Sequence, residues 1–395
     1  MNFSMLIGAF AIVLFILTVG EIISQKTKAF VPSVFVSAVL FLIGFWTIMP
    51  KDIITKASFE KPIVYVAMYL LLVHMGTLMN LKELLSQWKT VVIALAGIVS
   101  ICIMSLTVGK LLFGWENVVA ATPPLTGGVV ASILMAKAAT DKGLTAVAVL
   151  ATSMYIMQGF VGYPISAICL KKEARRVLSN FKENGGKERL AKKEAALSVG
   201  EPRKKLVPPL PEELQTPYMI LLKLGAVAWL ASKIGPVIHI NDFVVCLILG
   251  VIACEIGFLE EKALNKANAF GFLMTVLMAF IFANLSQATP AMLKQIIVPL
   301  LGIIVLGVIG MYIMSLILSK ALGFSKQMGF ACMLTALYGF PADYILTHEA
   351  IKSVCETKEE TEYVLDDMLP KMLVAGFTTV TIASVIIAGF FVKLL

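Results

Sequence analysis

The sequence predicts an all-α protein that crosses a membrane many times. Hydrophobic residues fill 59% of its 395 positions and charged residues only 15%, whereas soluble domains are about 45–50% apolar and about 25% charged. Apolar runs of roughly 20 residues, enough for a helix to span a bilayer, recur along the chain. Such segments lie near residues 4–22, 30–49, 62–80, 91–113, 116–137, 144–170, 217–235, 239–258, 267–287, 294–319, 327–347 and 370–393.

The first segment, 4–22, follows no basic region and ends without a small-residue cleavage site, so it is expected to be a retained helix rather than a signal peptide. Basic residues gather much later, in the stretch 171–216, which holds all four arginines and eight lysines. Cytoplasmic loops carry an excess of Lys and Arg, so this stretch is predicted to be a cytoplasmic linker. It accounts for the net charge of +8 without a nucleic-acid partner.

The basic linker divides the chain into two halves that resemble each other. "IMSLTVGKLLFGW" at 103–115 is similar to "IMSLILSKALGF" at 313–324, and each is followed by a segment interrupted by Pro and Gly. These similarities predict a repeat over 1–170 and a second over 217–395. Each repeat would hold about five transmembrane helices and one re-entrant hairpin, near 116–140 and near 327–350, divided between a scaffold domain and a transport domain.

The topology depends on whether the interrupted segments cross the membrane. If all six segments of each half cross, the halves run parallel; if the fifth enters and leaves on one side, the second half is inverted, as in many secondary transporters. The lysines outside the linker are too evenly distributed to decide. Prolines and paired glycines (Pro123, Pro124, Gly127 and Gly128) break a helix at one point. They favour two half-helices meeting at "PPLTGG".

The first interruption predicts a solute-binding tip. Non-helical backbone at membrane depth persists only where protein or a wet cavity surrounds it. The tip offers hydroxyls, together with the amides of two glycines and of the following helix start, which would suit an anion. A proline-kinked packing helix is the alternative interpretation. The candidate residues are Thr122, Thr126, Gly127, Gly128 and Ser132.

The second interruption, "LTALYGFPADYILTHE" at 334–349, supplies Thr335, Tyr338, Gly339 and Asp343 as the matching candidates. A carboxylate at membrane depth is costly and indicates a functional site. Asp343 could bind Na⁺, pair with a substrate ammonium or exchange a proton; a structural pair or helix cap is the alternative.

Three further residues are candidates for ion binding beside Asp343. Thr378 and Thr379 lie in the last apolar segment, and Asn284 lies in "IFANLSQ". Threonine hydroxyls also bond back to their own helix, so a structural role for them remains open. No arginine lies in the membrane segments. A carboxylate-bearing solute must therefore be held by amides, hydroxyls or a lysine.

Residues 124–174 resemble the sodium/glutamate symporter family, which carries an L-T-G-G stretch, a T-D-K-like turn and a small-residue-rich helix ending in basic residues. This chain departs from the family at Val129, Val130 and Ala131, which replace H-G-T, and at "YGFPADY", which replaces a T-P-T-A-type tip. The citrate-type 2-hydroxycarboxylate symporters share the same general layout. The matching positions are Leu125, Thr126, Gly127, Gly128, Thr140, Asp141, Lys142, Gly162, Pro164, Lys171 and Lys172.

This resemblance implies inverted repeats, a dimerising scaffold, and Na⁺-coupled, elevator-like movement of a small anionic or zwitterionic solute across a bacterial inner membrane. The altered tips leave the solute open between an amino acid and another carboxylate, and the coupling ion between Na⁺ and H⁺. A cation/proton antiporter with Asp343 as the titrating carboxylate is the second hypothesis. An enzyme is not expected, because the sequence has no HExxH or GxGD motif and no clustered metal ligands. No cofactor beyond the coupling ion is predicted.

Overall fold

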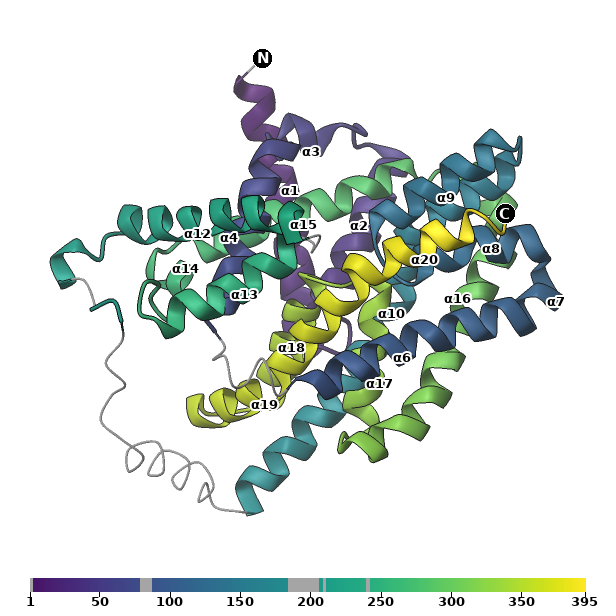
Figure 1. Ribbon diagram of the computed structural model, residues 1–395. Helices are drawn as coiled ribbons and strands as arrows, with labels where there is room; N and C mark the ends of the chain where they lie inside the picture. Colours follow the sequence, from purple (N-terminus) through teal and green to yellow (C-terminus); the bar gives the residue numbers. More distant parts are fainter. Residues whose placement is uncertain (1–2, 79–86, 184–205, 209–210, 239–241) are drawn as a thin grey trace. The chain divides into compact units, whose positions relative to one another are not determined.

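A computed structural model describes residues 3–78, 87–183, 206–208, 211–238 and 242–395 (Figure 1). The described residues form helices and turns and contain no strand. This confirms the predicted all-α class. Most of the basic linker, including Arg189 and Arg203, lies outside the described residues. Six helices within them are long and apolar enough to cross a membrane: Met5–Lys26, Trp88–Phe113, Thr145–Glu183, Pro217–Ile238, Phe270–Gln287 and Leu293–Leu322.

The chain divides into two compact units. Unit 1 comprises Met1–Ala57, Gln87–Val177 and Phe282–Leu395, and unit 2 comprises Ser58–Ser86 and Leu178–Ile281. Each unit therefore takes segments from both sides of the basic linker. Both predicted interruptions belong to unit 1.

Unit 2 is built around the crossing of α4 (Lys61–Gly76) and α13 (Asp242–Glu255). A Cβ added to Gly76 would lie 2.5 Å from the Leu247 carbonyl oxygen and 2.6 Å from the Val251 nitrogen, so the two backbones touch. Such close crossings are typical of helices in membranes. No hydrophobic force drives helices together there, and small residues let their backbones pack closely. Helix α12 (Pro217–Ile238) packs on both helices, and the short α14 (Ala263–Lys266) and most of α15 (Phe270–Ala283) complete the unit.

The N-terminal part of unit 1 pairs α1 (Phe3–Lys26) with α2 (Ser33–Thr47) and the short α3 (Ile53–Lys56). Helix α2 packs on the 3-10 turn η3 (Asn284–Gln287). The Phe41 and Phe282 rings stack there with centroids 5.2 Å apart. Long helix α16 (Pro290–Leu322) lies against α6 (Trp88–Met104), and this pair is a main packing contact of unit 1.

The first interruption is a reversal between α8 (Trp115–Leu125) and α9 (Val129–Asp141), which pack against each other. A π-helical turn η1 (Ser105–Gly109) and α7 (Lys110–Phe113) lead into it. Gly127 and Gly128 form the break with φ of 108° and 97°, values that favour glycine. Both prolines lie inside the last turn of α8, and the two helices meet at the paired glycines, within the predicted "PPLTGG" stretch.

The second interruption separates α17 (Lys326–Leu334) and the 3-10 turn η4 (Thr335–Leu337) from α18 (Ala342–Lys352). The chain then forms α19 (Lys358–Thr378), which a Thr357–Glu360 capping box begins. A π-helical turn η5 (Thr379–Ala383) separates α19 from α20 (Ser384–Phe391). The helix expected over 370–393 therefore contains a π-helical turn at η5, and π-helical turns of this kind are frequent at functional sites.

Helix α10 (Thr145–Glu183) runs further than its apolar segment predicts. The segment 144–170 ends where the charged residues begin, yet the helix continues to Glu183. Lys, Arg and Glu are good helix formers, so hydropathy marks the membrane boundary rather than the helix end. The first residues of the basic linker are therefore helical.

Candidate functional site

The tip of the first interruption lies directly on η5. A Cβ added to Gly127 would lie 3.0 Å from Val380 Cγ1, 3.1 Å from the Ala336 carbonyl oxygen and 3.3 Å from the Thr379 carbonyl oxygen. A Cβ on Gly128 would lie 2.7 Å from Ser384 Oγ. Glycine is required at both positions for two reasons. The positive φ disfavours any other residue, and the close approach to η5 leaves no room for a side chain.

The tip of the second interruption reaches the same turn. Gly339 has φ of 60°, and an added Cβ would lie 2.5 Å from Val380 Cγ2. Thr335 Oγ1 lies 3.4 Å from Thr379 Oγ1. The isopropyl group of Val380 therefore touches both tips, and the two interruptions meet at one side chain. We call Thr126, Gly127, Gly128, Thr335, Gly339, Thr379 and Val380 the tip cluster.

The hydroxyl groups around the tips already donate hydrogen bonds to main-chain carbonyl oxygens. Thr122 donates to the Val118 carbonyl oxygen (2.7 Å), Thr126 to Pro123 (2.8 Å), Thr335 to Cys332 (2.7 Å), Thr379 to Gly376 (3.1 Å) and Ser132 to Ala151 (3.1 Å). A hydroxyl has one proton and two acceptor lone pairs. The side chains therefore present acceptors to a ligand, rather than the donors that an anion needs.

Main-chain amides are the remaining donors. The prediction of a free Gly127 amide is wrong, because this N–H donates to the Pro124 carbonyl oxygen at 3.1 Å. The first amides of a helix have no partner within it, and Gly128 supplies no side-chain cap to α9. The start of α9 is thus where an anionic group would find donors.

Asp343 lies in the first turn of α18 and is fully buried. Its Oδ1 accepts a hydrogen bond from the Tyr344 amide at 2.6 Å. Its Oδ2 has no hydrogen-bond partner among the described residues and lies against the bare Cα of Gly376, where an added Cβ would overlap it. Among the described residues, no basic side chain forms an ion pair with Asp343.

The Tyr338 side chain contacts α10. Its hydroxyl donates to Ser166 Oγ at 2.7 Å, and its ring lies 5.6 Å from that of Tyr163. A Cβ added to Gly162 would lie 2.9 Å from Leu337 and 3.0 Å from Tyr338. Gly162 thus gives the second tip room against α10.

Two of the candidate ion ligands lie apart from the tip cluster in their contacts. Thr378 is half-buried and donates to the Val374 carbonyl oxygen at 2.7 Å, the back-bonding that the sequence left open. Asn284 lies in η3, which packs on α2. Sequence reasoning missed Val380, Ser384, Gly376 and Ser166. Only Gly376, a glycine inside an otherwise regular helix, left a signal that could have been followed.

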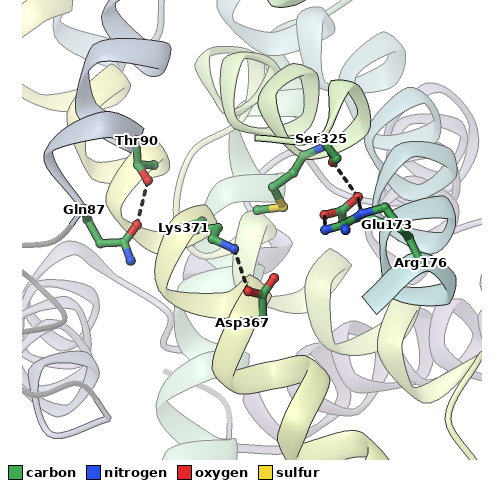
Figure 2. A network of polar contacts seen from close by, with 8 residues as sticks. Gln87, Thr90, Glu173, Arg176, Ser325, Asp367 and Lys371 are labelled. Atoms are coloured by element: carbon green, nitrogen blue, oxygen red, sulfur yellow. Dashed lines mark hydrogen bonds and ion pairs between the residues drawn. The ribbon is translucent and has the colours of Figure 1, made fainter. Parts of the chain in front are cut away.

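A second polar cluster lies at the start of α17 (Figure 2). The buried Glu173 accepts hydrogen bonds from Arg176 Nη2 at 2.7 Å, Arg176 Nε at 3.1 Å and Ser325 Oγ at 2.5 Å. Lys371 and Asp367 form an ion pair at 2.8 Å nearby on α19. We call these five residues the Glu173 cluster. Unlike Asp343, Glu173 has a cationic partner.

The interruptions are packed reciprocally against the last helices of the two halves. Trp115 Nε1 donates to the Leu394 carbonyl oxygen at 3.0 Å, while Gly127 meets Val380, so α8 runs antiparallel to residues 380–394. Figure 1 shows α20 beside α8 and α9. Ser325 contacts Glu173 and Leu337 contacts Gly162, so α17 runs antiparallel to α10.

Comparison with known proteins provides no family for this chain. No protein-family model matches it, and no curated protein is significantly similar to it. Among the described residues, no three His, Cys, Asp or Glu side chains gather in a way that could hold a metal ion. The tip cluster and Asp343 are therefore the features from which a function can be inferred.

Proposed function

We propose that this chain is a secondary active transporter of the bacterial plasma membrane that moves a small amino acid or carboxylate together with Na⁺. One observation carries the proposal: the interrupted segments of the two halves both end at the same π-helical turn, η5. Interrupted membrane helices at corresponding positions of two repeats mark the binding sites of secondary transporters. The broken backbone is buried by η5, as irregular backbone at membrane depth must be.

The reciprocal packing of α8 on residues 380–394 and of α17 on α10 supports two inverted repeats. In each half, the helix before the interruption packs on the last helix of the other half, as a two-fold relation between the halves requires. In this proposal each repeat has five crossings and one re-entrant hairpin. The basic linker, 171–216, is cytoplasmic.

The proposed mechanism is elevator-like alternating access. Unit 1, which contains both interruptions, carries the solute, and unit 2 is the scaffold that dimerises. The start of α9 holds an anionic group of the solute, and Asp343 holds a positive charge. The resemblance of residues 124–174 to sodium/glutamate symporters favours Na⁺ as the coupling ion, and the different tips favour a solute other than glutamate.

Uptake into proteoliposomes tests this function. The purified chain is reconstituted, an inward Na⁺ gradient is imposed, and labelled amino acids, dicarboxylates and hydroxycarboxylates are offered in turn. We expect accumulation of at least one solute that disappears when K⁺ replaces Na⁺ or when a Na⁺ ionophore collapses the gradient. Folded protein that accumulates no solute of the panel under a Na⁺ or H⁺ gradient would contradict the proposal.

The unpartnered Oδ2 of Asp343 favours a second candidate, a cation/proton antiporter in which this carboxylate binds Na⁺ and H⁺ in turn. Replacing Asp343 by Asn would then abolish pH-dependent Na⁺ exchange in vesicles without added solute. Exchange that persists in the Asn variant eliminates this candidate.

A further inference from the structure

We propose that Asp343 receives the ammonium group of the transported solute, so that the protein selects amine-bearing solutes over carboxylates that lack an amine. This inference rests on the proposed transport function and specifies its substrate class. It is carried by the unpaired charge of Asp343, by the acceptors of the tip cluster, and by the lack, among the described residues, of a group of side chains around the carboxylate that could hold a metal ion.

The first observation is the unpaired carboxylate. Asp343 is fully buried, one oxygen is held by the Tyr344 amide, and the other has no partner among the described residues. A buried ionised carboxylate needs a counter-charge, because desolvation penalises it heavily. No described side chain supplies that charge. A positively charged occupant would.

The second observation is the character of the tip cluster. The hydroxyls of Thr335 and Thr379 donate to the carbonyl oxygens of Cys332 and Gly376, and the two hydroxyl oxygens lie 3.4 Å from each other. The carbonyl oxygens of Ala336 and Thr379 both lie within 3.3 Å of the Cβ position of Gly127. An ammonium group has three N–H donors and no acceptor. The polar groups of the tip cluster thus match a donor better than an anion.

The third observation concerns a metal ion. The Cβ position of Gly376, which an added methyl group would take, overlaps Oδ2 and lies 3.6 Å from the Phe340 main-chain nitrogen. Hard metal ions demand a shell of oxygen ligands, and among the described residues no other carboxylate, His or Cys joins Asp343 in a group that could hold a metal ion.

Gly376 sets the position of the carboxylate. Because Gly376 has no side chain, Oδ2 can lie against α19, one helical turn before Thr379. A methyl group at this position would overlap Oδ2 and displace the carboxylate without removing its charge. Gly376→Ala is therefore a steric counterpart to the charge-removing Asp343→Asn.

The test compares matched solutes that differ only in the amine. The full-length protein in detergent is titrated by thermal shift with L-alanine and L-lactate, L-serine and glycerate, and L-glutamate and 2-hydroxyglutarate. A ligand that binds the native state raises the unfolding temperature. We expect the amine-bearing member of at least one pair to bind at least about tenfold more tightly than its hydroxy analogue, because a charge-assisted hydrogen bond is lost.

Asp343→Asn and Gly376→Ala should both abolish that preference, while Glu349→Gln should retain it. Glu349 lies at the other end of α18 and accepts a hydrogen bond from the Ser33 amide at 3.0 Å, so it is a carboxylate of the same helix with a partner. A cooperative unfolding transition without ligand shows that each variant folds.

Two results would overturn the inference while leaving transport intact. One is gradient-driven uptake of hydroxy analogues as strong as that of the amines. The other is an Asp343→Asn variant that keeps its amine preference but loses Na⁺ dependence, which would make Asp343 the ion site. If no solute of either kind is taken up by proteoliposomes, the proposed function itself fails.

Discussion

Two buried carboxylates of unit 1 have opposite surroundings. Glu173 accepts three hydrogen bonds, two of them from Arg176, and links α10 to the start of α17. Asp343, at the start of α18, has one oxygen bound to its neighbouring amide and the other unpartnered among the described residues. A paired buried charge serves the fold. An unpaired buried charge lowers stability and is retained where a bound ligand supplies the counter-charge.

The largest difference is expected between Glu173→Gln and Asp343→Asn, two isosteric removals of a negative charge. Glu173→Gln leaves Arg176 without its counter-charge and should cost about 2–3 kcal/mol of unfolding free energy. Asp343→Asn removes an unpaired charge and should cost less than about 1 kcal/mol or stabilise the protein. Thermal unfolding in detergent ranks the two variants. A loss for Asp343→Asn equal to that for Glu173→Gln would mean that Asp343 is structurally paired.

The next effect concerns the close packing of the tips. Gly339→Ala should cost about 2 kcal/mol, because an alanine at positive φ is strained and its methyl group overlaps Val380. Gly143→Ala is the matched control: Gly143 has φ of 74°, yet nothing lies within 4 Å of its Cβ position.

Adding Val380→Ala should recover part of the loss in Gly339→Ala and none of the loss in Gly143→Ala. A double-mutant cycle of unfolding temperatures measures this coupling. Equal losses for the two glycine variants, with no coupling to Val380, would show that the tips do not pack on η5.

The smallest effects distinguish a capping hydroxyl from a tip hydroxyl. Ser325→Ala removes the cap of α17, a 2.9 Å bond from the Met328 amide, and should cost about 1 kcal/mol. We expect its uptake of solute to be unchanged. Thr335→Val should cost a similar amount but weaken solute affinity severalfold, because it removes an acceptor of the tip cluster. The reverse pattern in uptake assays would place the binding site near the Glu173 cluster instead.

Much of the architecture was accessible from the sequence. Hydropathy located the apolar segments, and the glycines and prolines located both interruptions. The lengths of helices were less predictable, as α10 shows by continuing through charged residues to Glu183. Charged residues of high helix propensity continue the helix beyond the apolar segment, and hydropathy does not detect this.

The site was predicted only in part. Gly127, Gly128, Thr335, Gly339 and Thr379 do meet at η5, but nothing in the sequence identified Val380 as the side chain between them. A valine in an apolar helix has no distinguishing pattern, and the π-helical turn that holds it depends on packing by segments far away in the chain. The direction of the hydroxyl protons, which changes the tips from donors to acceptors, is likewise a property of the folded helices.

The contact between Trp115 and Leu394 has a consequence for how the protein is made. The two residues are 279 positions apart, so the α8–α9 hairpin is synthesised long before the helix that covers its tip. During that interval Gly127 and Gly128 have no η5 to lie on, and their backbone must be sheltered by other partners. Truncation before Val380 should therefore leave an early hairpin exposed and mark the unfinished chain for degradation.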